Sequence, residues 1–115
     1  MDEAEMHKNY ESGRYLFREH EHGDQAFVIE SGNVEIIKAA GDEVKVIATI
    51  GAGAIIGEMA LITDKPHTAS ARALGTVSAS VFSRNEFERM LAKTDPLIRG
   101  VLRILAESVR DLTKS

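Results

Sequence analysis

A glycine-rich stretch over residues 51–69 holds the polar side chains best suited to binding a ligand. Glycine allows the backbone to approach a ligand closely. A turn of helix beginning near Glu58 would point its first amides outward, where they favour an anion such as phosphate. The Glu58 carboxylate, at the mouth of the same turn, can accept hydrogen bonds from sugar hydroxyls. On these residues alone, the stretch is either a phosphate-binding turn or an ordinary glycine-rich turn.

The elements that would position this stretch are strands over about residues 15–82. Residues 77–81 alternate strictly between apolar and small side chains, which is the pattern of a half-buried strand. Short strands separated by regularly spaced turns predict a mainly β fold, a sandwich or a barrel. Further apolar runs cover residues 26–30, 34–39 and 44–50, with turn signals at residues 31–33 and 41–42.

The sequence changes to a helical pattern after residue 82. Ser83 and Glu86 form a capping-box pair, because the serine hydroxyl can accept from the Glu86 amide while the Glu86 carboxylate reaches back to the Ser83 amide. This pair predicts a helix over about residues 84–93. An aspartate as N-cap and a proline at the first helical position predict a second helix, over about residues 96–113.

The second predicted helix carries a broad apolar face. Its members are Ile98, Leu102, Leu105, Val109 and Leu112, at spacings of four and three, with Leu97, Val101 and Ile104 beside them. Either the whole face packs on the β fold, or part of it pairs with a second copy of the chain, giving a homodimer through residues 97–112. Gly100 costs this helix about 1 kcal/mol relative to alanine, so we expect a close backbone contact or a bend there.

Residues 57–69 resemble the phosphate-binding cassette of the cyclic-nucleotide-binding domains found in cyclic-AMP-dependent kinase regulatory subunits and in the bacterial catabolite activator. That pattern reads phenylalanine-glycine-glutamate, a short apolar stretch, and then proline-arginine-threonine (or alanine or serine)-alanine. The matching residues here are Gly57, Glu58, Met59, Ala60 and Leu61 in the first half, and Pro66, Thr68 and Ala69 in the second.

The resemblance extends from about Tyr10 to Leu112 and implies a fold. The expected fold is a single domain over residues 1–115, an antiparallel eight-stranded β-roll (jelly-roll-like) with flanking N- and C-terminal α-helices. The β-roll would occupy about residues 15–82.

The resemblance also implies a regulatory domain without catalytic residues, which binds a cyclic nucleotide and relays binding through its C-terminal helix. Glu58 would accept a hydrogen bond from the ribose 2′-hydroxyl, and Thr68 would donate to a phosphate oxygen. Cyclic AMP is favoured over cyclic GMP, although the C-terminal helix offers no aromatic side chain to stack on a base. The expected ligand-binding residues are Gly57, Glu58, Met59, Ala60, His67 and Thr68.

His67 departs from the family pattern, which has an arginine there. The charged fork of arginine suits bidentate phosphate binding, and losing such a contact typically costs about 1.5–3 kcal/mol, or some 10- to 100-fold in affinity. Three interpretations stay open: weak cyclic-nucleotide binding that improves at acidic pH, binding of another small anion, or a degenerate β-roll serving as a dimerisation or protein-interaction module. Arg72 either supplies the missing charge or is a solvated arginine on an outward strand face.

Other function classes have less support. A metal-binding cupin is also a β-roll and could use His20 and His22, but no third ligand follows at the required place. A net charge of −4 with interspersed signs argues against a nucleic-acid surface. The chain has no cysteine and no apolar run of the roughly 18 residues that a membrane span needs. We expect a cytoplasmic protein that is not an enzyme, with no metal and no membrane or nucleic-acid partner.

Overall fold

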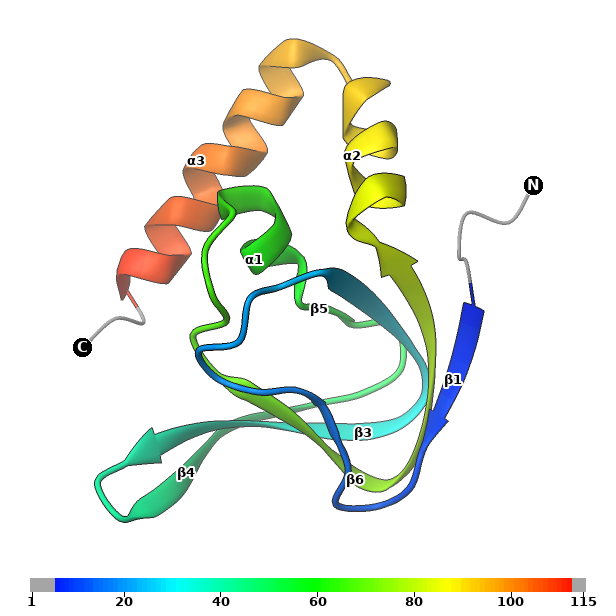
Figure 1. The fold of residues 1–115 in the computed structure, drawn as a ribbon, viewed down its shortest axis with the longest axis vertical. Coiled ribbons are helices and arrows are strands. Elements are labelled where there is room, and N and C mark those ends of the chain that lie inside the picture. Colours follow the sequence, from blue (N-terminus) through cyan, green and yellow to red (C-terminus); the bar gives the residue numbers. More distant parts are fainter. Residues whose placement is uncertain (1–5, 113–115) are drawn as a thin grey trace.

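Two long antiparallel strands, β3 (Gln25–Ala40) and β6 (Ser70–Ser83), form the centre of a six-stranded sheet in the computed structural model, which describes residues 6–112. The order is β1-β6-β3-β4, with β2 also paired to β6 and β5 to β3. The strands curve into a roll, and the helices lie together on one side of it (Figure 1). The other elements are β1 (Met6–Tyr10), β2 (Tyr15–Phe17), β4 (Glu43–Ile50), β5 (Ile55–Ile56), α1 (Glu58–Thr63), α2 (Arg84–Ala92) and α3 (Pro96–Leu112).

The mainly β, antiparallel prediction is confirmed, but the described residues form six strands rather than eight. Residues 31–33, predicted as a turn, lie within β3, where the register against β6 shifts twice. Gly32 permits this bulge because its φ is 91°, and a Cβ there would lie 2.3 Å from the carbonyl oxygen of Thr76. One long, irregular strand thus replaces two short ones.

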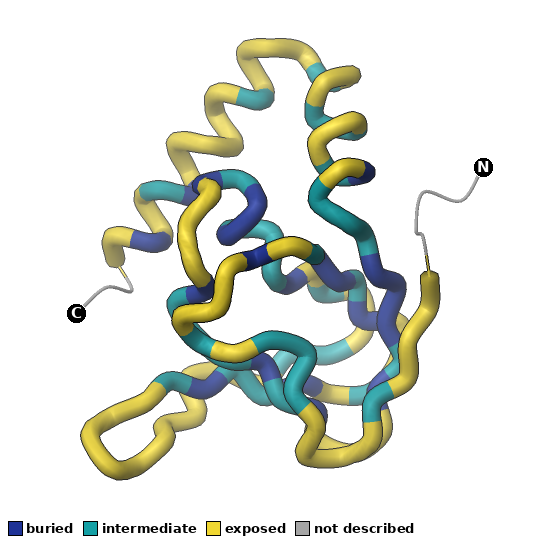
Figure 2. Tube along the Cα trace, in the orientation of Figure 1, coloured by how far each residue is buried: buried dark blue, intermediate teal, exposed yellow. Residues whose placement is uncertain are grey.

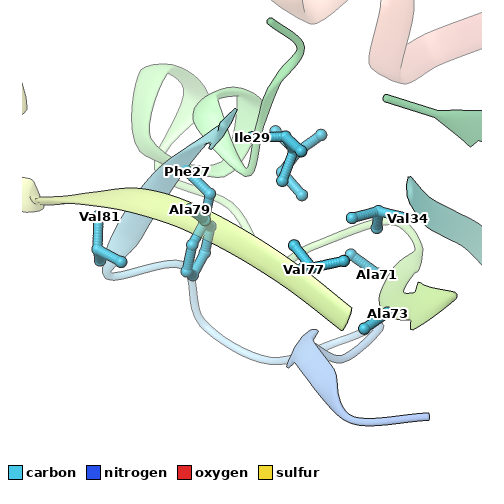
Figure 3. Close-up of a cluster of buried hydrophobic side chains, with 9 residues drawn as sticks. Phe27, Ile29, Val34, Ala71, Ala73, Val77, Ala79 and Val81 are labelled. Carbon is cyan, nitrogen blue, oxygen red and sulfur yellow. The ribbon is translucent and has the colours of Figure 1, made fainter. Parts of the chain in front are cut away.

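The core side chains come mainly from β3 and β6, and the core also anchors the glycine-rich stretch. Ile56 belongs to the core and directly precedes Gly57, so packing holds the stretch in place just before Glu58. Burying a side chain of this size contributes roughly 1.5–3 kcal/mol. Figure 3 shows the cluster, which consists of Phe27, Ile29, Val34, Ile56, Ala71, Ala73, Val77, Ala79 and Val81.

The two C-terminal helices begin as the sequence predicts. The Ser83 hydroxyl accepts from the Glu86 amide at 3.1 Å, and the Glu86 carboxylate accepts from the Ser83 amide at 3.4 Å. Asp95 Oδ1 accepts from the Leu97 amide at 2.8 Å. The predicted end of α3, residue 113, lies outside the described residues. The expected N-terminal helix is not found within the described residues, whose first element is β1.

Most of α3 is exposed (Figure 2), and the residues of its apolar face are exposed rather than packed on the roll. Leu97 is 75% exposed and Ile104 is 66% exposed, whereas Ala106 and Arg110 are the buried residues of α3. The interpretation in which the whole face packs on the roll is therefore wrong. The contact expected at Gly100 is also not found, since no described atom beyond its own helix lies within 4 Å of a Cβ built there. No helix within residues 6–112 is long and apolar enough to cross a bilayer.

Candidate ligand-binding site

All six residues predicted to bind a ligand line one cavity of about 180 Å³. The cavity lies between the roll and α3, since residues from β2, β3, β5 and α3 complete its wall. Its volume is below the range of roughly 300–1,000 Å³ typical of small-molecule sites, so a ligand of mononucleotide size must extend into solvent or displace part of the wall. The lining consists of Gly57, Glu58, Met59, Ala60, His67 and Thr68, together with Phe17, Ile36, Ile55, Ile56, Ala69 and Arg110.

Glu58 opens α1 directly after Gly57. Gly57 has a φ of 83°, in the left-handed region that favours glycine, and it gives α1 no side-chain cap. Glu58 Oε2 is buried and has no hydrogen-bond partner among the described residues. Burial raises the pKa of the Glu58 carboxyl. A buried acceptor without a donor is costly, so this oxygen is poised to accept a hydrogen bond from a ligand.

His67 is buried and forms part of the cavity wall. Its imidazole stacks on Phe17, with ring centroids 3.9 Å apart and planes inclined by 15°. Its backbone amide donates to the Glu21 carbonyl at 2.9 Å, and its carbonyl accepts from the His20 amide at 2.8 Å. Burial lowers the pKa of His67, nearby Arg110 lowers it further, and Glu21 opposes both. At neutral pH the ring is therefore an uncharged, packed side chain.

Gly23 brings the loop before β3 against both His67 and α1. A Cβ at Gly23 would lie 2.4 Å from the Ala60 Cβ and 3.3 Å from two ring atoms of His67. The Gly23 carbonyl accepts a hydrogen bond from Arg84 Nη2, and Arg84 Nη1 lies 3.4 Å from Asp64 Oδ1 at the end of α1. The first residue of α2 thus ties this loop to the glycine-rich stretch.

The polar face of α3 contacts the last turn of α1 and the loop that follows it. Arg103, Glu107 and Arg110 recur at spacings of four and three residues, so they share one face of the helix. That face is distinct from the exposed apolar one and includes the buried Ala106. Three contacts join it to residues 62–66: Arg103 Nη1 to the Ile62 carbonyl at 2.6 Å, Glu107 Oε1 to Lys65 Nζ at 3.4 Å, and Arg110 Nη1 to the Pro66 carbonyl at 2.8 Å.

Three other side chains considered from the sequence lie outside the cavity wall. Arg72 Nη2 is 3.0 Å from Glu35 Oε1 on β3, so Arg72 does not supply the charge missing at His67. The side chains of His20 and His22 are exposed, each near a carboxylate of its own loop. Within residues 6–112, no group of three or more histidine, cysteine, aspartate or glutamate side chains is arranged to hold a metal ion.

Phe17 and Arg110 are among the cavity residues that the sequence did not predict. Phe17 lies far upstream of the cassette, and Arg110 is one of several arginines on the polar side of an amphipathic helix. Both reach the cavity through contacts between segments distant in the sequence.

Comparisons with known proteins identify the kind of domain that contains the glycine-rich stretch. A family model described as a cyclic nucleotide-binding domain matches residues 7–94. The cAMP-dependent protein kinase regulatory subunit of Emericella nidulans is 31% identical over 90 residues, covering 78% of this chain and 21% of the relative. The cGMP-dependent protein kinase of Toxoplasma gondii is 38% identical over 96 residues, covering 78% of this chain and 9% of the relative.

Solved structures agree with the sequence matches. The EAL enzyme Bd1971 superposes with a TM-score of 0.85 in its cAMP-bound form and 0.87 in its cGMP-bound form, at 28% identity in both. The matches cover 91% and 95% of this chain, and 28% and 29% of the Bd1971 chains. The chain thus spans about a fifth of the Emericella relative and under a third of Bd1971. Because the family model covers most of its length, the chain belongs to the cyclic nucleotide-binding domain family.

Proposed function

We propose that this domain is a regulatory sensor, not an enzyme, which binds a cyclic nucleotide in the cavity beside α1. The observation that carries the proposal is that Glu58, a residue of the cavity wall, has a buried Oε2 without a hydrogen-bond partner among the described residues. A ribose 2′-hydroxyl carries one O–H donor, which this acceptor needs, and a hydrogen bond to a charged carboxylate is stronger than a neutral one.

Within the cassette itself, the phosphate side of the proposed site offers only neutral donors. Met59, Ala60 and Thr68 line the cavity together with Glu58. The Thr68 hydroxyl and the backbone amides of Met59 and Ala60 are donors of the kind that a phosphate oxygen accepts. His67 is uncharged at neutral pH because burial lowers its pKa. We therefore expect binding to be weaker than with an arginine at this position, by about 10- to 100-fold.

Cyclic AMP is the proposed ligand, in preference to cyclic GMP. The relatives support the ligand class, because they include kinases named for each nucleotide and a structure of Bd1971 with each one bound. Ile36, Ile55 and Ile56 give the cavity an apolar wall suited to a purine face. Titration with both nucleotides measures the preference.

Binding would be relayed through α3. The three contacts from Arg103, Glu107 and Arg110 attach this helix to the last turn of α1 and to the loop between α1 and Thr68. A ligand that shifts this loop changes the docking free energy of α3 and so biases the position of the helix. The cytoplasmic location expected from the sequence stays a prediction.

The exposed apolar face of α3 favours a second function, homodimerisation. Contiguous apolar patches of this kind mark interaction sites on soluble domains, and a β-roll that had lost its ligand would still serve as a dimerisation or protein-interaction module. The exposed residues are Leu97, Ile98, Val101, Leu102, Ile104, Leu105, Val109 and Leu112.

Calorimetric titration of cyclic AMP and cyclic GMP into the wild type, Glu58→Gln and Glu43→Gln tests the binding proposal. Glu43 is a matched control because it is an exposed glutamate at the start of β4 and outside the cavity wall. We expect Glu58→Gln to weaken binding about 10-fold or more, and Glu43→Gln to leave it unchanged. If neither the wild type nor His67→Arg binds either nucleotide, the proposal is wrong and the dimerisation module is favoured.

A further inference from the structure

The family pattern has a positively charged arginine at position 67, but this chain has a histidine there, so this position gives the cavity no permanent positive charge. His67 occupies that position as a buried ring stacked on Phe17. A cyclic nucleotide carries one negative charge on its phosphate, and burying a charge without a partner of opposite sign is costly. Some other group must therefore balance this charge if the ligand enters the cavity.

Arg110 is the only lysine or arginine among the described residues that line the cavity. It comes from α3, and only 6% of its surface is exposed. Its Nη1 donates to the carbonyl oxygen of Pro66 at 2.8 Å, so the guanidinium lies beside the residue that precedes His67. Arg110 and His67 are also close enough to interact electrostatically, because the charge of Arg110 contributes to lowering the pKa of His67.

We propose that Arg110 supplies, from α3, the positive charge that binds the phosphate of the ligand, in place of the arginine that the cassette lacks. The inference rests on the proposed function and assigns this role to a residue outside the cassette. A guanidinium has five N–H donors in a rigid fork, so one arginine can hold a carbonyl oxygen and an anionic oxygen together. Arg110 can therefore contact the ligand while it keeps α3 on the loop through Pro66.

The arrangement makes α3 part of the binding site. In a domain whose cassette carries its own arginine, the phosphate charge is balanced within the loop. Here ligand binding and the docking of α3 share one side chain, so each favours the other by the same free energy.

A set of charge variants, titrated with cyclic AMP by calorimetry, tests this role. The set comprises wild type, Arg110→Gln, Arg110→Lys, His67→Arg and the double variant His67→Arg/Arg110→Gln. Arg103→Gln is the matched control, because Arg103 also anchors α3, through the Ile62 carbonyl of α1, but lies outside the cavity wall. Thermal unfolding of each variant shows whether it remains folded.

We expect Arg110→Gln to weaken binding about 10- to 100-fold, Arg110→Lys to retain part of the affinity, and Arg103→Gln to lose less than Arg110→Gln. In the His67→Arg background, Arg110→Gln should cost much less, because the cassette arginine then balances the phosphate. A purely structural role for Arg110 predicts the same loss in both backgrounds and a similar loss for Arg103→Gln, and either result overturns the inference. Binding by His67→Arg without binding by the wild type also overturns it, while leaving the ligand class intact. Absence of binding in every variant overturns the proposed function itself.

Discussion

His67 lies face to face with Phe17, with ring centroids 3.9 Å apart and planes inclined by 15°. The stack joins β2 to the loop after α1, and both rings line the cavity. The imidazole thus packs as an aromatic wall residue at the position where the family pattern has a phosphate-binding arginine. Burial in this wall disfavours the protonated ring and lowers the pKa of His67, so we expect the site to be sensitive to pH.

The first prediction concerns stability and pH. Because the pKa of His67 is lowered in the folded chain, the unfolded chain binds this proton more readily, and stability falls as the pH drops below the ordinary value of 6.5. The stability that the neutral ring contributes is fully present above pH 6.5. It is lost as the pH falls from 6.5 through the lowered pKa of the folded chain. Thermal unfolding at about pH 7.5 and about pH 5.5 should show a smaller loss for His67→Gln than for wild type. Equal losses in the two proteins would contradict this account.

The second prediction concerns Glu58. Burial raises the pKa of its carboxyl, so the folded chain holds this proton more tightly than the unfolded chain, and stability declines as the pH rises above the ordinary value of 4.5. Glu58→Gln removes the buried charge, and we expect it to stabilise the ligand-free domain at neutral pH by about 0.5–2 kcal/mol. Denaturant unfolding measures the change, with Glu43→Gln as control. Destabilisation by Glu58→Gln would show that the carboxylate serves the fold rather than a ligand.

The third prediction contrasts two glycines. A Cβ at Gly23 would lie 2.4 Å from the Ala60 Cβ, whereas one at Gly100 meets no described atom beyond its own helix within 4 Å. Gly23→Ala should therefore destabilise the domain by roughly 1–3 kcal/mol. Gly100→Ala should stabilise it by about 1 kcal/mol through helix propensity. Denaturant unfolding measures both changes in stability. If Gly23→Ala leaves the free energy of unfolding unchanged, the loop and α1 can move apart at little cost and the prediction is wrong.

Local motifs explain which features the sequence could predict. Glu58 at the start of α1 and the Ser83–Glu86 capping box depend on residues within a few positions of each other, so their types and spacing predict the geometry. The resemblance placed the cassette residues, which the structure brings together around one cavity.

Contacts between distant segments explain what the sequence could not predict. Arg110 and Pro66 are 44 positions apart, and no local pattern singles out this arginine. The amphipathic pattern of α3 indicated a helix, but it could not show that the polar face docks and the apolar face stays exposed. Likewise, residues 31–33 have the composition of a turn, and only pairing along β6 turns them into a bulge.

The fourth prediction concerns that exposed face. Leu105 lies on it and is 56% exposed, so in an isolated domain Leu105→Glu should change stability by only about 0.5 kcal/mol. If the face pairs two copies of the chain, the charge opposes association. Light scattering at micromolar concentration should then give a dimer mass for wild type and a monomer mass for Leu105→Glu. A monomer mass for the wild type would remove the homodimer from the account.

The most direct test of the central claim is hydrogen exchange of the wild type with and without saturating cyclic AMP, read segment by segment. A ligand in the cavity contacts the cassette and, through Arg110, the last helix. The account predicts slower exchange in residues 57–69 and in α3 when the nucleotide is present, with β1 and the β3–β4 hairpin unchanged. Unchanged exchange in residues 57–69 at saturating nucleotide would contradict it.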